Sequence, residues 1–288
     1  MIPAQFDYMK PASIADAIAA LQQGGEDAKI IAGGQSLMPV LRLRLAAPSL
    51  VVDLAGIAEL RGIREDGDHI VIGAMAPYHD IMRDDLVKEH VALLAQSVAT
   101  VADNQVRHRG TLGGALAHAD PAGDLGAVTL ALDAELVIAS AGGTRTVPAA
   151  EFFQGLFTTA IGEAEILTEI RFPKYTGWGS HYEKFNRTAQ AWSMCAVAVA
   201  VKVAKDGSGA GTIAQARVGL TNMGATPIRA TGVEQALVGQ PASAEAVAAA
   251  AEHAAEGTDA PSDADAAADY REHLARVLTG RAVLAAAG

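Results

Sequence analysis

Two short glycine-rich segments constrain the fold of this chain more than any other feature of its sequence. The first, residues 32–36, reads Ala-Gly-Gly-Gln-Ser. The surrounding pattern predicts a strand over residues 28–32 before it and a helix over residues 37–45 after it. Glycines let the backbone approach a ligand closely, and a helix N-terminus offers unpaired N–H groups to phosphate. A tight turn with Ser36 as the helix N-cap explains the same residues equally well.

The second segment, residues 111–115, reads Thr-Leu-Gly-Gly-Ala and follows a helix that apolar periodicity predicts over about residues 86–106. Arg107, His108 and Arg109 complement the C-terminal end of that helix, and Gly110 suits the position just after it. These roles leave residues 111–114 without a structural explanation. Two glycine loops that each follow a secondary-structure element suit the pyrophosphate of a dinucleotide, held from both sides.

A nicotinamide site of the Rossmann type is the obvious alternative, because Asp53 follows the first glycines by about 20 residues. The Rossmann fingerprint needs a third glycine, which allows close packing of helix on strand. Here the segment reads Gly-Gly-Gln-Ser-Leu-Met from Gly33 onward, without that glycine. We therefore reject this alternative and interpret Asp53 as a turn residue at a strand end.

The chain has one cysteine, Cys195, within an apolar stretch. An iron–sulfur cluster usually needs four thiolates and a structural zinc site two or more, so any redox role requires a bound organic cofactor. Cys195 is predicted to be an inert buried thiol. His118 has no second histidine or cysteine at metal-ligand spacing and is interpreted as a loop residue. Without a convincing nucleophile–base motif, the residues favour a flavin dinucleotide carrier over a hydrolase.

Length and charge narrow the class further. A chain of 288 residues predicts two domains. Its net charge of -11, with the basic residues scattered, argues against nucleic acid or an anionic membrane surface as the main partner. We find no secretory signal and no apolar run near the ~20 residues that span a bilayer. The expected location is therefore cytoplasmic.

The coarse organisation is predicted from periodicity and turn residues. A first helix runs over residues 13–22, with Ser13 as N-cap and Gly24-Gly25 as its end. The candidate domain boundary lies at residues 177–179. Strands are expected at residues 50–54, 69–73, 135–139, 144–148, 165–172, 194–203 and 212–220, a hairpin turn at 205–211, and Ala-rich helices at 233–237, 243–256 and 264–287.

The longest informative stretches are DAKIIAGGQSLMPVLRLRL and VADNQVRHRGTLGGALAHADPAGD. They closely resemble the medium, FAD-binding subunits of molybdenum hydroxylases, in particular those of aerobic carbon monoxide dehydrogenases. The resemblance covers nearly the whole chain, from FDYMKPAS through EILTEIRFP and YEKFNR to VGLTNMGATPIRA. The paired A-G-G-x-S and T-[IL]-G-G motifs are specific for the family, whereas substrate assignments within it are much less so.

The resemblance implies an α+β fold. Residues 1–176 would form an FAD-binding domain of the vanillyl-alcohol-oxidase/PCMH type, with two α/β subdomains at about 1–55 and 56–176. Residues 177–288 would form a C-terminal domain with a three-stranded antiparallel sheet and a helical bundle. FAD would lie between the N-terminal subdomains, with its isoalloxazine end toward the C-terminal domain.

The resemblance also assigns residues to the cofactor. Those that would hold the pyrophosphate and adjoining groups are Ile30, Ile31, Ala32, Gly33, Gly34, Gln35, Ser36, Leu37, Thr111, Leu112, Gly113, Gly114 and Ala115. Val101 is assigned to the same site. Gln35 stands where close relatives often carry His, and Ala115 where more distant ones carry Asn.

Four further residues are assigned by position. Asp124 would accept a hydrogen bond from the ribose–adenine half, and Leu167 would pack on the flavin side. Lys184 would lie near the ring, where a cation stabilises reduced anionic flavin. Trp192 matches a position that is often aromatic near the isoalloxazine, and a core aromatic is its alternative. Ala191, before it, replaces a frequent Asp.

The implied function is electron transfer inside a larger assembly. Substrate would be oxidised on a molybdenum-cofactor large subunit, and [2Fe-2S] clusters on a small subunit would pass electrons to FAD here and on to a quinone or other acceptor. The assembly would be a dimer of heterotrimers, with any contact to the inner face of the membrane made through partners. No catalytic residue and no metal ligand are expected in this chain. The FAD would be non-covalent, since neither loop holds a His or Cys.

Carbon monoxide is the first choice of substrate. Aldehydes and N-heterocycles such as purines, nicotine or caffeine are alternatives that similar subunits serve. A self-sufficient flavin reductase, like UDP-N-acetylenolpyruvoylglucosamine reductase, is a second alternative, although the Ala-rich C-terminal half offers no obvious acid–base set. A non-catalytic nucleotide-binding module is a third.

Overall fold

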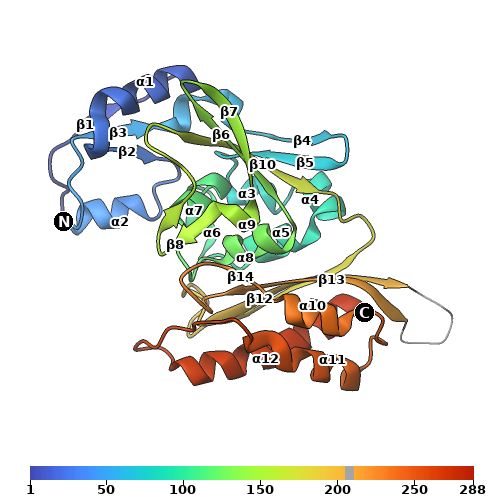
Figure 1. Ribbon diagram of the computed structural model, residues 1–288. Coiled ribbons are helices and arrows are strands. Elements are labelled where there is room, and N and C mark those ends of the chain that lie inside the picture. The colour runs from blue at the N-terminus through green and yellow to red at the C-terminus, as the bar shows by residue number, and fades with distance from the viewer. Residues whose placement is uncertain (205–210) are drawn as a thin grey trace.

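The computed structural model describes residues 1–204 and 211–288 as three lobes (Figure 1). The first lobe is a parallel sheet of strand order β1-β3-β2, with two helices. Its elements are β1 (Asp7–Met9), α1 (Ile14–Gly24), β2 (Ala28–Ile31), α2 (Leu37–Arg42) and β3 (Leu50–Asp53). As predicted, the Ser13 hydroxyl caps α1 by accepting from Asp16 N, and Gly25 ends it with a φ of 59°. Helix α2 stops at Arg42, earlier than predicted, because Arg44 adopts a left-handed φ of 57°.

The second lobe is a five-stranded antiparallel sheet of order β4-β5-β10-β6-β7. Its strands are β4 (Ile63–Asp66), β5 (His69–Gly73), β6 (Glu135–Ser140), β7 (Gly143–Pro148) and β10 (Ile166–Pro173). The helices of this lobe are α3 (Tyr78–Ile81), α4 (Asp85–His90), α5 (Ala92–Ala99), α6 (Asn104–Arg107), α7 (Leu112–His118), α8 (Asp124–Ala131) and α9 (Ala149–Phe152). A small hairpin of β8 (Phe153–Gly155) and β9 (Thr158–Thr159) follows α9.

The single long helix predicted over residues 86–106 is wrong. The structure has three helices there, α4, α5 and α6. Val91 separates α4 from α5, because its backbone is not helical, with a φ of -138° and a ψ of 47°. Ala102 has a φ of 43°, and the carboxylate of Asp103 caps α6 by accepting from Val106 N. Successive short helices that pack on one core repeat their apolar residues at helical spacing, so periodicity alone does not reveal the breaks.

The third lobe is an antiparallel sheet of order β11-β12-β13-β14 with helices on one face. Its three long strands, as expected, are β11 (Gly179–Phe185), β12 (Cys195–Ala204) and β13 (Thr212–Thr221), and the structure adds the two-residue β14 (Ile228–Arg229). The helices are α10 (Thr231–Leu237), α11 (Ala244–Ala251) and α12 (Ala268–Ala287). All but the last residue of the predicted hairpin turn at 205–211 lies outside the described residues.

Strand β12 forms a shared wall between two hydrophobic cores. Its valines and Cys195 face the core under α10, α11 and α12, whereas Ala196, Ala198 and Ala200 belong to the core of the second lobe. The small alanines let α5 and α8 pack directly on the sheet, which Figure 1 shows enclosed by helices on both faces. Burial raises the pKa of the Cys195 thiol to about 12, so the predicted inert thiol is confirmed.

Candidate cofactor site

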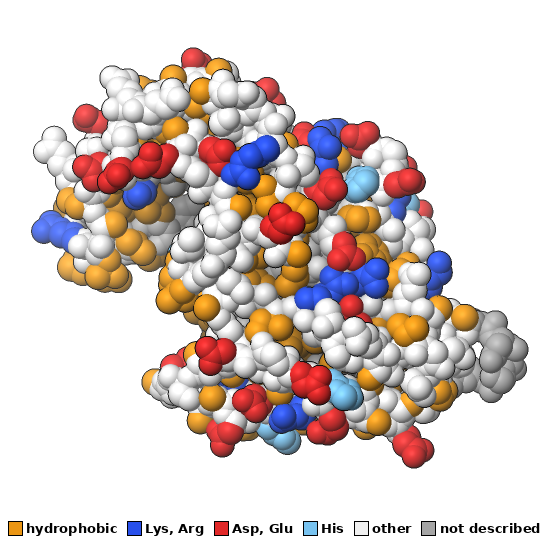
Figure 2. Space-filling view, in the orientation of Figure 1, with side chains coloured by type: hydrophobic (Ala, Val, Ile, Leu, Met, Phe, Trp, Pro, Cys, Tyr) orange, Lys and Arg blue, Asp and Glu red, His pale blue; other side chains and the backbone are white. Residues whose placement is uncertain are grey.

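A cavity of about 1160 Å³ lies where the three lobes meet and receives residues from both glycine loops. Figure 2 shows this face of the molecule hollowed between the first lobe and the rest. Most of the residues assigned from the sequence line the cavity: Ile30, Ala32, Gly33, Gly34, Gln35, Ser36, Leu37, Val101, Thr111, Gly113, Gly114, Ala115, Asp124, Leu167, Lys184 and Trp192. The structure therefore brings two loops that are far apart in sequence to one cavity.

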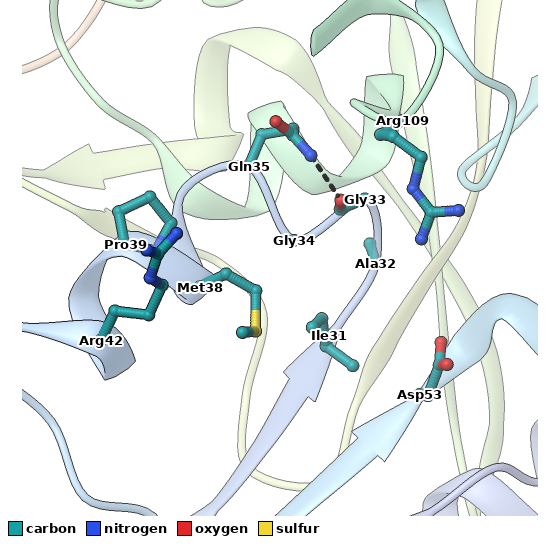
Figure 3. Close-up of a pocket in the computed structure, with 10 residues that line it drawn as sticks. All are labelled: Ile31, Ala32, Gly33, Gly34, Gln35, Met38, Pro39, Arg42, Asp53 and Arg109. Atoms are coloured by element: carbon teal, nitrogen blue, oxygen red, sulfur yellow. Dashed lines mark hydrogen bonds between the residues drawn. The ribbon is translucent and has the colours of Figure 1, made fainter. Parts of the chain in front are cut away.

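The first glycine loop joins β2 to α2 and is rich in free hydrogen-bond donors. Within the described residues, no acceptor is hydrogen-bonded to the backbone N–H groups of residues 33–36. Gly34 has a φ of 75°, which sets the turn of the loop. The Gln35 side chain donates back to the Gly33 carbonyl at 3.0 Å (Figure 3). The loop is thus held by its own side chain and leaves successive N–H groups for an anion.

The alternative interpretation of this loop, a tight turn, predicts that the Ser36 side chain caps α2. Ser36 occupies the N-cap position of α2, yet its side chain makes no capping hydrogen bond. The adjacent backbone donors of residues 33–36 line the cavity and have no acceptor among the described residues. A bound phosphate group satisfies them, so the loop fits the pyrophosphate of FAD.

The second glycine loop differs, because most of its backbone N–H groups are already hydrogen-bonded within the protein. Leu112 N donates to the Ala76 carbonyl at 3.2 Å, and Gly113 N donates to the Ala74 carbonyl at 2.9 Å. The Thr111 hydroxyl caps α7 by accepting from Gly114 N at 3.2 Å. The backbone donors over residues 112–115 are therefore consumed by the end of the sheet and by α7 itself.

Close packing explains the glycines of this second loop. A Cβ on Gly113 would lie 2.5 Å from the Ala74 Cβ, so only glycine lets α7 sit against the strand end. Leu112 is wrong as a lining residue, because its side chain is fully buried in the core of the second lobe. Ile31 lines a smaller recess instead.

The first loop touches the residues that lead into the second loop directly. A Cβ on Gly33 would lie 2.1 Å from the Arg109 carbonyl oxygen, so a side chain there would push the loops apart. On the other side of the first loop lies the recess of about 460 Å³ drawn in Figure 3, with Arg42 and Arg109 on its wall. Asp53 lies there too and caps the following turn by accepting from Ala55 N at 2.8 Å. Its interpretation as a strand-end turn residue is confirmed.

Asp124 and Lys184 form an ion pair of 2.8 Å in the cavity wall, with side chains only 3% and 6% exposed. They were assigned to opposite ends of the cofactor, and the structure places them at the same end, so that separation of roles is wrong. Asp124 also accepts from the Tyr182 hydroxyl at 2.7 Å and from the Ser193 hydroxyl at 2.6 Å. Burial and the Asp124 carboxylate raise the pKa of Tyr182 well above its usual value, so it stays a neutral donor.

Sequence reasoning missed Tyr182 and Ser193. They lie 58 and 69 residues from Asp124 along the chain, and although Tyr182 begins the YEKFNR stretch, nothing in that stretch points to Asp124. Trp192 is 57% exposed and lines the cavity beside Gln190 and Ala191. The core-aromatic alternative for Trp192 is therefore wrong.

The described residues also bear on other kinds of site. Among them, no group of three or more His, Cys, Asp or Glu side chains is placed to hold a metal ion. Likewise, no described helix has both the length and the apolarity that crossing a membrane requires.

Comparison with known proteins accounts for both halves of the chain. Residues 4–175 match the family model of the FAD binding domain in molybdopterin dehydrogenase, and residues 180–286 match that of the CO dehydrogenase flavoprotein C-terminal domain. The carbon monoxide dehydrogenase medium chain of Hydrogenophaga pseudoflava is 40% identical over 289 residues, covering 99% of this chain and 98% of that one. Caffeine dehydrogenase subunit beta of Pseudomonas sp. (strain CBB1) is 35% identical over 291 residues, covering 100% and 96%.

A solved structure agrees with the sequence matches. It is the carbon monoxide dehydrogenase from Hydrogenophaga pseudoflava that lacks the Mo-pyranopterin moiety of the molybdenum cofactor, with a TM-score of 0.95 and 41% identity, over 99% of this chain and 98% of that one. Together with the donor-rich loop and the cavity, these matches show that the chain belongs to the family of FAD-binding medium subunits of molybdenum hydroxylases.

Proposed function

We propose that this chain carries FAD in an aerobic carbon monoxide dehydrogenase and relays electrons from the iron–sulfur subunit to an external acceptor. The observation that carries the proposal is the row of N–H groups over residues 33–36, which lie at the wall of the cavity and have no acceptor in the described part of the chain. When bound, FAD supplies the redox chemistry, whereas the protein binds it, orients it and sets its electrostatic surroundings.

The first loop binds the pyrophosphate in this proposal. Its N–H groups donate to the phosphate oxygens, Gly34 sets their direction through its positive φ, and Gln35 fixes the loop from behind. The second loop is a support rather than a donor, since its contact at Gly33 keeps the first loop in place. Thr111 alone keeps a backbone N–H with no acceptor among the described residues.

The flavin end lies toward the third lobe in this proposal. Lys184 places its ammonium in the wall there, so it holds a positive charge beside the ring. Val101 and Leu167 supply apolar walls, and the exposed Trp192 stands at the edge of the cavity. We assign residues 1–176 to the FAD-binding domain, with subdomains at about 1–55 and 56–176, and residues 177–288 to the C-terminal domain.

The proposed partners are a molybdenum-cofactor large subunit and a [2Fe-2S] small subunit in a dimer of heterotrimers. The relatives named as carbon monoxide dehydrogenase medium chains are 40% identical over nearly their whole length, which supports carbon monoxide as the substrate. The acceptor is a quinone, reached at the inner face of the cytoplasmic membrane through partner proteins. No residue of this chain contacts the substrate.

A second candidate is the medium subunit of an N-heterocycle dehydrogenase. The similarity to caffeine dehydrogenase subunit beta spans the whole chain and favours it. Since the substrate would bind on another subunit in both cases, the two candidates predict the same cavity here.

The deciding experiment is purification of the tagged chain from its native host, followed by metal analysis and dye-linked assays with carbon monoxide, an aldehyde and caffeine. The proposal expects co-purified molybdenum and iron, FAD released fully by acid precipitation, and oxidation of carbon monoxide. Oxidation of caffeine alone would favour the second candidate. Substrate turnover by the isolated, metal-free chain would refute the subunit proposal and favour a self-sufficient flavin reductase.

A further inference from the structure

The carboxylate of Asp124 is shared by three residues of the third lobe. Its Oδ2 accepts from Lys184 Nζ at 2.8 Å. Its Oδ1 accepts from the hydroxyl of Tyr182 at 2.7 Å and from that of Ser193 at 2.6 Å. The two carboxylate oxygens therefore have different partners, one a cation and the other a pair of neutral hydroxyls.

This division fixes the orientation of the carboxylate. Asp124 is the first residue of α8, where the helix dipole favours a negative charge. Two hydroxyl donors on Oδ1 also oppose rotation of the group. A nearly buried ion pair tolerates little misplacement, because desolvation offsets most of its Coulomb attraction.

Lys184 keeps one donor that no described residue takes. An ammonium group carries three N–H donors. One bonds Asp124 Oδ2, and a second reaches the Thr100 carbonyl at 3.4 Å. Because Lys184 lines the cavity, the third is available to a ligand there.

The backbone of Ser193 is anchored through Asn222. Asn222 Nδ2 donates to the Ser193 carbonyl at 2.7 Å, and Asn222 N donates to the Pro121 carbonyl at 2.9 Å. Pro121 precedes α8 by a few residues, so the contacts close a ring that returns to Asp124. The network ties the segment before β12 to the start of α8.

We propose that Tyr182 and Ser193 are positioning residues for Lys184 and act through Asp124. By occupying Oδ1, they leave a single oxygen to the ammonium, so that Lys184 keeps its place and its third donor at the cavity wall. Without them, Asp124 turns both oxygens to the ammonium and draws its charge away from the flavin. The inference rests on the proposed role of Lys184 at the flavin end.

The test is a redox titration of the flavin absorbance in the assembly purified with its partner subunits. Lys184→Met removes the cation and moves the flavin midpoint potential to a more negative value. Tyr182→Phe and Ser193→Ala shift it in the same direction by a smaller amount, and Ser193→Thr, which keeps a hydroxyl, restores the unmodified value. Thr279→Val is the matched control. It removes a buried hydroxyl of α12 that has no hydrogen-bond partner among the described residues, and it should leave the flavin midpoint potential unchanged.

The outcomes distinguish the proposed role of Lys184 from the positioning role of Tyr182 and Ser193. An unchanged potential in Lys184→Met would refute the proposed role of Lys184 itself. A shift in Lys184→Met without any shift in Tyr182→Phe and Ser193→Ala would overturn the positioning role and leave the proposed function intact. Tyr182→Phe keeps the ring and Ser193→Ala removes one oxygen, so both variants fold. Their thermal unfolding midpoints check that a shift in potential is not a loss of structure.

Discussion

The two glycine loops look alike in sequence and differ in what their glycines do. In the first, the backbone N–H groups over residues 33–36 have no acceptor among the described residues. In the second, Gly113 packs against Ala74 and the N–H groups over residues 112–115 are already bonded. The first loop (residues 32–36, the ligand loop) leaves N–H donors for the proposed ligand, whereas the second (residues 111–115, the packing loop) packs on the sheet. A glycine motif therefore does not by itself identify donors.

The largest expected effect is on the packing loop. Gly113→Val places a side chain 2.5 Å from Ala74, and overpacking of this kind costs about 3 kcal/mol. The free energy of unfolding of the FAD-free chain in urea should fall by that amount. Gly142→Val, at an exposed turn with space around it, is the control and should change it by less than about 0.5 kcal/mol. Equal stability of both variants would contradict the packing role.

The next effect is on the ligand loop. Gly34→Ala strains a residue at a φ of 75° by about 1 kcal/mol and turns the loop donors away from the phosphates. Losing one charge-assisted hydrogen bond, worth about 2 kcal/mol, weakens FAD binding by more than tenfold, measured by equilibrium dialysis of the purified assembly. Gly257→Ala imposes the same strain at a φ of 69° outside the cavity and should leave FAD affinity unchanged. An equal loss of FAD affinity in Gly34→Ala and Gly257→Ala would contradict a specific role of Gly34 in binding.

Removing the side-chain hydroxyl of Thr111 or of Ser36 should affect different quantities, stability in one loop and FAD affinity in the other. Thr111→Ala removes a capping bond and should lower the free energy of unfolding by about 1 kcal/mol. Ser36→Ala removes no capping bond and should change stability by less than about 0.5 kcal/mol while lowering FAD affinity. Urea unfolding and dialysis of both variants give the two quantities. A Ser36→Ala variant as destabilised as Thr111→Ala would restore the tight-turn explanation.

The smallest effect concerns Gln35, which braces the ligand loop through the Gly33 carbonyl. Gln35→Ala removes one exposed hydrogen bond worth about 0.5 kcal/mol, which corresponds to roughly a twofold rise in the Kd for FAD. Gln105→Ala, on exposed α6, serves as the control. An unchanged Kd in Gln35→Ala would mean that the loop keeps its shape without the brace.

Features set by neighbouring residues could be predicted from the sequence. The Ser13 cap, the Gly25 helix end and the strand β12 follow from local chemistry and were right. The family and most of the cavity lining followed from the resemblance to the family over nearly the whole chain. The failures at the cavity depend on distant partners. Nothing near Gly113 reveals that Ala74 takes its N–H, and nothing near Asp124 reveals Tyr182 and Ser193.

The alternation along β12 has a consequence for how this molecule loses its structure. Because Ala196, Ala198 and Ala200 complete one core and the intervening valines another, melting of the third lobe would expose the second lobe in the same event. Residues 56–288 should then behave as one cooperative unit in hydrogen exchange, with the slowest amides of β5 and β12 sharing a single opening free energy. The core of the first lobe has no residue of β12 and instead includes Ala139 of β6 and Ile166 of β10, so opening of the first lobe, and with it of the entrance for the cofactor, depends on its packing against those two strands.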